Sequence, residues 1–233
     1  MPLVITVLEF LILIIVLAAL RTRLVYELAG TSLLMFSSTR PGITLYSILV
    51  LPGTIIHELS HWLVAEILRV RTGTITILPE LSGEGGSERL GSVSTERTDP
   101  IRGFLIGIAP FFTGMLILLV LARLLLLGWG VYVWWQIVLL IYGIMVTGNS
   151  MMISKEDRRT WPVMIVLIGA GLFLLERTGF AISPTSYIWI NETLDNLNLV
   201  LGVTASFNLV MIGGSYLLRR LIERATGRRI VHK

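Results

Sequence analysis

The chain is organised around one apolar stretch that carries a pair of histidines, GITLYSILVLPGTIIHELSHWLVAEI at residues 42–67. The stretch is long enough to cross the hydrocarbon core of a bilayer as a helix. Residues four apart on a helix lie on the same face, so His57 and His61 can bind one metal ion together. Glu58 completes the pattern H-E-x-x-H, which is typical of zinc hydrolases that use the glutamate as general base on a zinc-bound water.

Two observations favour a functional motif over a chance occurrence of this short pattern. The chain has only three histidines, and His57 and His61 are two of them. Glu58 also lies inside an apolar segment, where a charge is costly and ionisable groups are usually functional. The pattern therefore predicts a metal site with Glu58 as the catalytic residue.

Composition predicts an integral membrane protein that crosses the bilayer several times. Hydrophobic residues make up 54% of the 233 residues and charged residues 15%, whereas a soluble domain carries about 25% charged residues. We expect one membrane-embedded domain over residues 1–233. The absence of cysteine excludes cysteine-based metal and nucleophile sites.

The positive net charge of +4 is only a weak indication of nucleic-acid binding, and the positions of the basic residues favour another role. Most basic residues flank the apolar segments or lie in the tail at 219–233, where they act as topology signals and contact lipid headgroups. The expected partner is therefore the lipid bilayer, with no nucleic acid.

The apolar segments predict an all-α membrane protein, a polytopic bundle of about six transmembrane helices. Residues 25–38 contain Glu27 and Gly30 and are short for a span, which favours a re-entrant or interfacial piece and leaves a further span as an open alternative. Residues 176–198 are predicted to be a polar connection, with a short interfacial helix as one option. The six predicted spans are 3–20, 42–67, 101–127, 131–148, 161–175 and 199–218.

The longest polar stretch, residues 69–102, separates the second and third predicted spans. Within it, Thr74–Ile77 alternates apolar and polar side chains, and Leu90–Ser94 reads as a second short strand. We therefore expect a small β-hairpin-like insertion at the membrane surface.

The distribution of basic residues predicts the orientation of the bundle. The basic tail at 219–233 is expected in the cytoplasm, and counting back places the loops at 69–102 and 149–160 there too. The turn at 128–130 is then outside. The predicted metal site consequently faces the cytoplasmic side. With six spans the N-terminus is also cytoplasmic. Three basic residues then lie outside, against the positive-inside rule that basic residues are enriched on the cytoplasmic side: Arg21, Arg23 and Arg40.

A catalytic zinc ion needs a third protein ligand. The remaining histidine, His232, lies in the tail, so the third ligand must be a carboxylate. Glu66 points away from the histidine face, and the two acidic residues of the 176–198 connection lie on the opposite side. The carboxylate candidates are Glu66, Glu80, Glu84, Glu156, Asp157, Glu192 and Asp195. Glu156 and Asp157 fit best, because they lie on the correct side where apolar sequence resumes.

The H-E-x-x-H motif in a membrane segment, followed by a β-like insertion and a downstream aspartate, resembles the site-2 protease family of intramembrane zinc metalloproteases. The resemblance covers a core of about residues 42–175. It implies Asp157 as the third zinc ligand and Asn149, eight residues earlier, as a substrate-binding residue. It also implies hydrolysis of peptide bonds in membrane-spanning or membrane-associated protein substrates. Arg158 follows Asp157 where the family commonly has glycine.

Two alternatives to this function remain open from the sequence. One is another membrane zinc hydrolase, such as a protease of the prenyl-protein-processing type, with a glutamate as third ligand: Glu80, Glu84 or Glu156. The other is a non-catalytic membrane protein that binds metal, against which the intact Glu58 argues.

Overall fold

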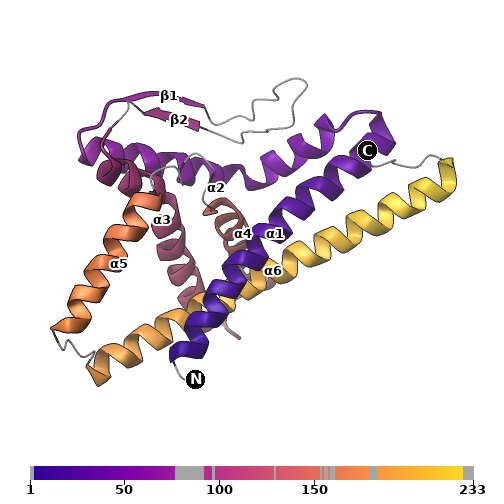
Figure 1. The fold of residues 1–233 in the computed structure, drawn as a ribbon. Helices are drawn as coiled ribbons and strands as arrows, with labels where there is room; N and C mark the ends of the chain where they lie inside the picture. Colours follow the sequence, from indigo (N-terminus) through magenta and orange to yellow (C-terminus); the bar gives the residue numbers. More distant parts are fainter. Residues whose placement is uncertain are drawn as a thin grey trace.

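A computed structural model describes residues 3–76, 92–95, 98–128, 130–152, 154, 157, 161–178 and 183–227. The described residues are predominantly helical and form a bundle with two short strands packed along one end (Figure 1). The helices are α1 (Leu3–Phe36), α2 (Arg40–Ile67), α3 (Pro100–Leu127), α4 (Trp134–Ser150), α5 (Trp161–Arg177) and α6 (Pro184–Thr226). The strands are β1 (Thr72–Thr76) and β2 (Ser92–Thr95).

Four of these helices are long and apolar enough to cross a membrane, namely α1, α2, α3 and α6. This is compatible with the predicted multi-pass membrane protein. Helices α4 and α5 have 17 residues each. The predicted count of six spans is therefore not confirmed, whereas the all-helical membrane class agrees with the fold.

Helix α1 is continuous, so the prediction of a separate re-entrant piece at 25–38 is wrong. That prediction depended on the short length of the segment and on its Glu27 and Gly30. The Glu27 side chain is only 1% exposed and forms ion pairs with Arg23 at 2.6 Å and with Arg219 of α6 at 3.2 Å. Because the buried carboxylate is paired, the helix can continue through it to Phe36.

Helix α6 begins at Pro184, so the polar connection predicted for 176–198 is wrong for most of its length. Ser183 caps the helix by accepting a hydrogen bond from the Ser186 amide at 3.1 Å. Asn198 donates to the Thr6 carbonyl oxygen of α1 at 3.1 Å. The polar residues of this segment are therefore accommodated by hydrogen bonds to α1 rather than by a loop.

Helices α1 and α6 run parallel and pack along each other (Figure 1). Near their N-terminal ends, the Leu3 amide donates to the Tyr187 hydroxyl at 2.9 Å. Near their C-terminal ends, the Thr31 hydroxyl donates to the Ser215 carbonyl oxygen at 3.2 Å. The start of α1 therefore lies at the opposite end of the bundle from the end of α6.

Helix α2 runs across one end of the bundle (Figure 1). At its start, the Gly42 amide donates to the Ser32 hydroxyl in the last turns of α1 at 3.0 Å. Just beyond its end, Val70 packs against Ile106 near the start of α3. Both ends of α2 therefore meet the same end of the bundle.

The main core lies where α1, α3, α4 and α6 meet. Its fully buried members are apolar, and they hold the helices that carry the candidate site in fixed relative positions. They include Leu17, Leu118, Ala122, Ile144, Val200 and Leu201. A smaller cluster of Leu24, Tyr46 and Val50 fixes α2 to α1.

Strands β1 and β2 pair antiparallel, with Thr72 opposite Thr95 and Thr76 opposite Ser92. The two strands lie close to the positions expected from the alternating sequence. The residues that join them, 77–91, lie outside the described residues. A hairpin connection between the strands therefore stays a prediction.

Candidate metal centre

The structure brings the three predicted metal ligands together. His57 and His61 lie one helical turn apart on α2, and Asp157 comes from the connection between α4 and α5. The Nε2 atoms of His57 and His61 lie 3.9 and 3.3 Å from the Asp157 carboxylate oxygens. The ligand atoms of these residues all lie within 4.8 Å of one another, so the group can hold a metal ion.

The other ring nitrogen of each histidine contacts a backbone carbonyl. His57 Nδ1 lies 2.6 Å from the Ser150 oxygen, and His61 Nδ1 lies 2.8 Å from the Ile106 oxygen. A carbonyl oxygen can only accept, so each Nδ1 carries the hydrogen and donates it. In the neutral ring Nε2 is then unprotonated and presents its lone pair. Metal-binding histidines are commonly oriented by such a hydrogen bond from the second nitrogen.

The two imidazoles and the Asp157 carboxylate are arranged as ligands of a cation. Two neutral imidazoles with Nδ1–H present two lone pairs to the Asp157 carboxylate, and three electron-pair donors that face one another repel. A metal ion between them turns the repulsion into coordination. Two imidazole nitrogens and one carboxylate are the donor set of a three-ligand catalytic zinc site, which keeps one position open.

Asp157 is held in place by a short polar motif and by a close backbone approach. The Ser154 amide donates to the Asp157 carboxylate at 2.9 Å, and the Asp157 amide donates to the Ser154 hydroxyl at 3.2 Å. This reciprocal pattern is that of a capping box. On α3, a Cβ at Gly107 would lie 2.5 Å from the Asp157 carbonyl oxygen. Only glycine at position 107 therefore allows Asp157 to come this close to α3.

Glu58 lies beside the ligand group and is only 5% exposed. Within the described part of the chain, no hydrogen bond or ion pair engages its carboxylate. Its charge interacts unfavourably with that of Asp157. A positive ion at the site would relieve the repulsion between these two carboxylates.

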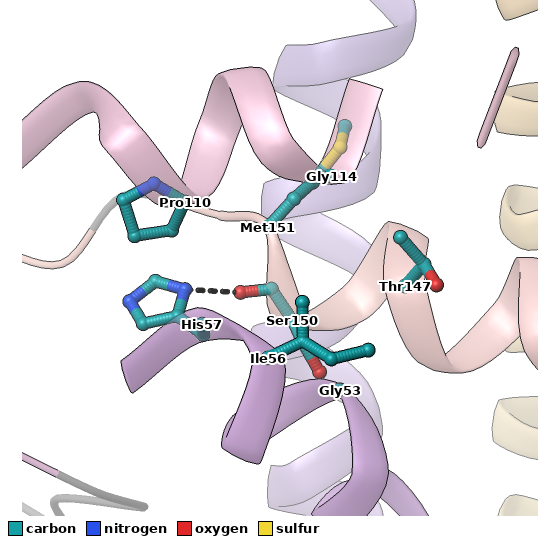
Figure 2. Close-up of a pocket in the computed structure, with 8 residues that line it drawn as sticks. All are labelled: Gly53, Ile56, His57, Pro110, Gly114, Thr147, Ser150 and Met151. Atoms are coloured by element: carbon teal, nitrogen blue, oxygen red, sulfur yellow. Dashed lines mark hydrogen bonds between the residues drawn. The ribbon is translucent and has the colours of Figure 1, made fainter. Parts of the chain in front are cut away.

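A small pocket opens beside His57 (Figure 2). It is formed by α2, α3 and the end of α4, and the ring of Pro110 lies across from the His57 imidazole. Gly53 and Gly114 line its wall, and the absence of their side chains lets Ser150 and Met151 come close.

Asn149 lies next to Ser150 in sequence, but its side chain points to α6. Its amide group donates to the Asn208 side-chain oxygen at 3.1 Å and accepts from the Asn208 amide at 2.8 Å. It also donates to the Met145 carbonyl oxygen at 2.9 Å. These contacts give Asn149 a packing role between α4 and α6. Its predicted role in substrate binding stays a prediction.

The remaining carboxylate candidates divide into two groups. Glu66 accepts a hydrogen bond from the Thr72 hydroxyl at 3.3 Å, and Asp195 accepts one from Asn191 at 2.9 Å. Neither these two residues nor Glu192 belongs to the ligand group. The loop glutamates Glu80 and Glu84 and the neighbouring Glu156 lie outside the described residues.

Sequence reasoning missed three groups that orient the site. The carbonyls of Ser150 and Ile106 are backbone atoms, and no residue type signals which carbonyl a distant histidine will contact. Ser154 could have been found, because the spacing Ser154-x-x-Asp157 is that of a capping box.

Comparisons of the chain with family models, with curated proteins and with solved structures gave no match. The functional conclusion below therefore depends on the sequence motif and the geometry of the site.

Proposed function

We propose that this chain is a membrane-embedded metal hydrolase. The observation that carries the proposal is the convergence of His57 Nε2, His61 Nε2 and the Asp157 carboxylate, with both Nδ1 atoms bound to backbone carbonyls. The activity that we propose within this class is that of a zinc metalloprotease, which cleaves membrane-spanning or membrane-associated proteins. The resemblance of the motifs to site-2 proteases supports this choice.

Glu58 supports catalysis over a purely structural metal site. A structural zinc site is usually closed by four protein ligands, whereas the group here offers three and leaves one position open. A carboxylate that is buried beside the ligands and unpaired among the described residues is costly unless it has a function. Position 58, next to the first histidine, is where zinc hydrolases of this motif carry the general base.

The chemistry that follows is hydrolysis of a peptide bond. Bound zinc would supply Lewis acidity, which polarises a carbonyl and lowers the pKa of water. Glu58 takes a proton from the attacking water and later delivers it to the leaving amine. The backbone carbonyls of Ser150 and Ile106 keep both imidazoles in the tautomer that binds metal. Asp157 balances part of the positive charge.

The substrate class follows from where the site lies. The ligands are carried by a helix that is apolar enough for the membrane, so a substrate must reach them from within or beside the bilayer. A substrate helix must also unwind locally before its backbone meets the site. Among the described residues each strand of the β1–β2 pair has one unpaired edge, and such an edge can hold an extended segment by strand addition. We propose that the site faces the cytoplasm, as the basic tail and loops indicate.

The test is a search for new protein N-termini in membranes of cells that express the wild-type chain or Glu58→Gln. We expect peptides that begin inside or next to transmembrane segments to be present with the wild type and lost with the variant. Equal sets of N-termini would remove the protease proposal. Zinc binding with no such cleavage would favour the non-catalytic alternative.

A further inference from the structure

The contacts of α2 show that the helix does not run the length of the bundle. Its start contacts Ser32 in α1, and its centre accepts a hydrogen bond at the Leu49 carbonyl oxygen from the Tyr142 hydroxyl of α4 at 2.9 Å. Its last half contacts Ser150 at the end of α4 and Ile106 near the start of α3. Ser32, Ser150 and Ile106 lie at the end of the bundle that carries the metal ligands, and Tyr142 reaches Leu49 from the middle of α4.

The arginines of the described residues gather at this same end. Nine lie in the second half of α1, at the start of α2, just after its end, at the start of α3 or in the last turns of α6: Arg21, Arg23, Arg40, Arg69, Arg71, Arg102, Arg219, Arg220 and Arg224. Two lie toward the opposite end, Arg123 near the end of α3 and Arg177 at the end of α5. Arginine in such excess marks the end of a membrane protein that faces the cytoplasm.

One stripe of α2 is apolar and uncovered. It consists of Leu45, Ile48, Leu59, Leu63 and Ile67, which are 46–69% exposed. Successive members are separated by three or four residues, or by a sum of such steps, so all five lie on one side of the helix. His57 and His61 face the protein on the other side. Arg40 begins the helix, and Arg69 and Arg71 follow its end. An apolar stripe between flanking arginines is typical of a helix that lies in the membrane interface.

We propose that α2 is embedded in the cytoplasmic leaflet, and that it enters and leaves the membrane on the same side. Its apolar stripe contacts lipid acyl chains, and the arginines at its ends contact anionic headgroups. The chain then crosses the bilayer an odd number of times, and its N-terminus and C-terminus lie on opposite sides. The metal ligands lie at the depth of one leaflet.

This topology removes the conflict that the six-span prediction contains. With α2 as a full crossing, Arg40 and the arginines of α1 lie outside, against the positive-inside rule. With α2 confined to one leaflet, Arg40 lies on the same side as Arg71 and Arg219. The parallel packing of α1 and α6 requires the same result, because it places Arg23 beside Arg219 through Glu27.

The chain has no cysteine, so single cysteines can report the topology directly. Four exposed positions suit this purpose: Thr39→Cys before α2, Thr74→Cys in β1, Val131→Cys between α3 and α4, and Thr185→Cys at the start of α6. Thr39 makes no side-chain capping hydrogen bond, so its replacement removes none. Each full-length variant is labelled with a membrane-impermeant maleimide in intact cells and in inverted vesicles. Labelling in detergent shows that each thiol can react.

The proposal predicts that Thr39→Cys and Thr74→Cys are labelled only in inverted vesicles. Val131→Cys and Thr185→Cys are then labelled only in intact cells. Labelling of Thr39→Cys from the same side as Val131→Cys would show that α2 completes a crossing and would overturn the proposal. Labelling of Thr39→Cys and Thr74→Cys together from outside would overturn the assignment to the cytoplasmic leaflet. Neither result depends on metal binding or on proteolysis.

Discussion

His57 of α2 donates a hydrogen bond from Nδ1 to the Ser150 carbonyl oxygen of α4 at 2.6 Å. This bond joins two segments that are 93 residues apart in the sequence, and it depends on the close approach of the two helices at Gly53. A Cβ at position 53 would meet the Ser150 hydroxyl and would lie 2.7 Å from the Val146 carbonyl oxygen. The absence of a side chain at Gly53 therefore lets Ser150 reach His57.

Gly53→Ala tests this relationship. The added methyl group must push α4 away from α2, so the Ser150 carbonyl no longer orients His57. Loss of such an orienting partner lowers metal affinity about 10- to 100-fold. A zinc-competition titration of the purified protein with a chelator measures this change. Gly202→Ala in α6 is the matched control, because nothing lies within 4 Å of its Cβ position. Equal zinc affinities of the two variants would contradict the assignment.

Glu58→Gln separates catalysis from metal binding. The glutamine cannot accept a proton, so we expect proteolytic activity to fall about 10²- to 10⁴-fold, the usual contribution of a general base. Zinc content should stay at the wild-type level, because Glu58 is not one of the ligands. Glu66→Gln is the control from the same helix, since Glu66 bonds to Thr72 instead. Loss of zinc from Glu58→Gln would assign Glu58 to coordination instead.

The buried pair of Asn149 and Asn208 predicts coupled effects on stability. Asn208→Leu leaves the Asn149 side-chain oxygen without its donor, and an unsatisfied buried group costs about 1–3 kcal/mol of unfolding free energy. The double variant Asn149→Leu/Asn208→Leu should lose less than the sum of the single variants. Unfolding of all four proteins in detergent measures this coupling. Additive losses, with a raised KM for Asn149→Leu alone, would support the predicted substrate role.

The hydrogen bonds of Asp99 at the start of α3 predict that the stability of the fold depends on pH. Its carboxylate accepts hydrogen bonds from the Arg102 amide at 3.0 Å and the Ile101 amide at 3.1 Å. These bonds, chiefly the one from Arg102, lower the pKa of Asp99 below its ordinary value of 3.8. Because the pKa of Asp99 is lower in the folded protein than in the unfolded chain, the ionised carboxylate stabilises the fold. This contribution is complete at pH values above the ordinary pKa, and it is lost as the pH falls through the pKa of the folded protein.

We therefore expect Asp99→Ala to lower the midpoint temperature of unfolding at pH 7. The difference from wild type should shrink as the pH falls below the ordinary pKa of Asp99. Asp99→Ser keeps a side-chain oxygen at the cap and should unfold closer to wild type. A difference between wild type and Asp99→Ala that does not change with pH would exclude the charged cap.

The parts of the fold that the sequence predicts are those encoded by local pattern. The spacing of His57 and His61 places them on one helix face, and alternating side chains indicate the strands. The continuity of α1 could not be fully predicted, because Glu27 is buried against α6 and forms an ion pair with Arg219, almost two hundred residues later, besides its local pair with Arg23. The early start of α6 was readable, since Ser183 and Pro184 form a common helix start.

The candidate site shows the same division between local and tertiary information. The motif identifies the two histidines and Glu58, whereas Asp157 was chosen over Glu156 by resemblance to a family. The orienting carbonyls of Ser150 and Ile106 depend on how α2 packs against α3 and α4, which no local pattern reveals.

The metal content of the detergent-purified protein, wild type beside Asp157→Ala, tests the central claim most directly. The account predicts close to one zinc ion per wild-type chain and a large loss in the variant, because three protein ligands hold a catalytic zinc ion. Zinc in both proteins would move the third ligand to another carboxylate. A wild-type protein that holds no metal after incubation with zinc would contradict the account.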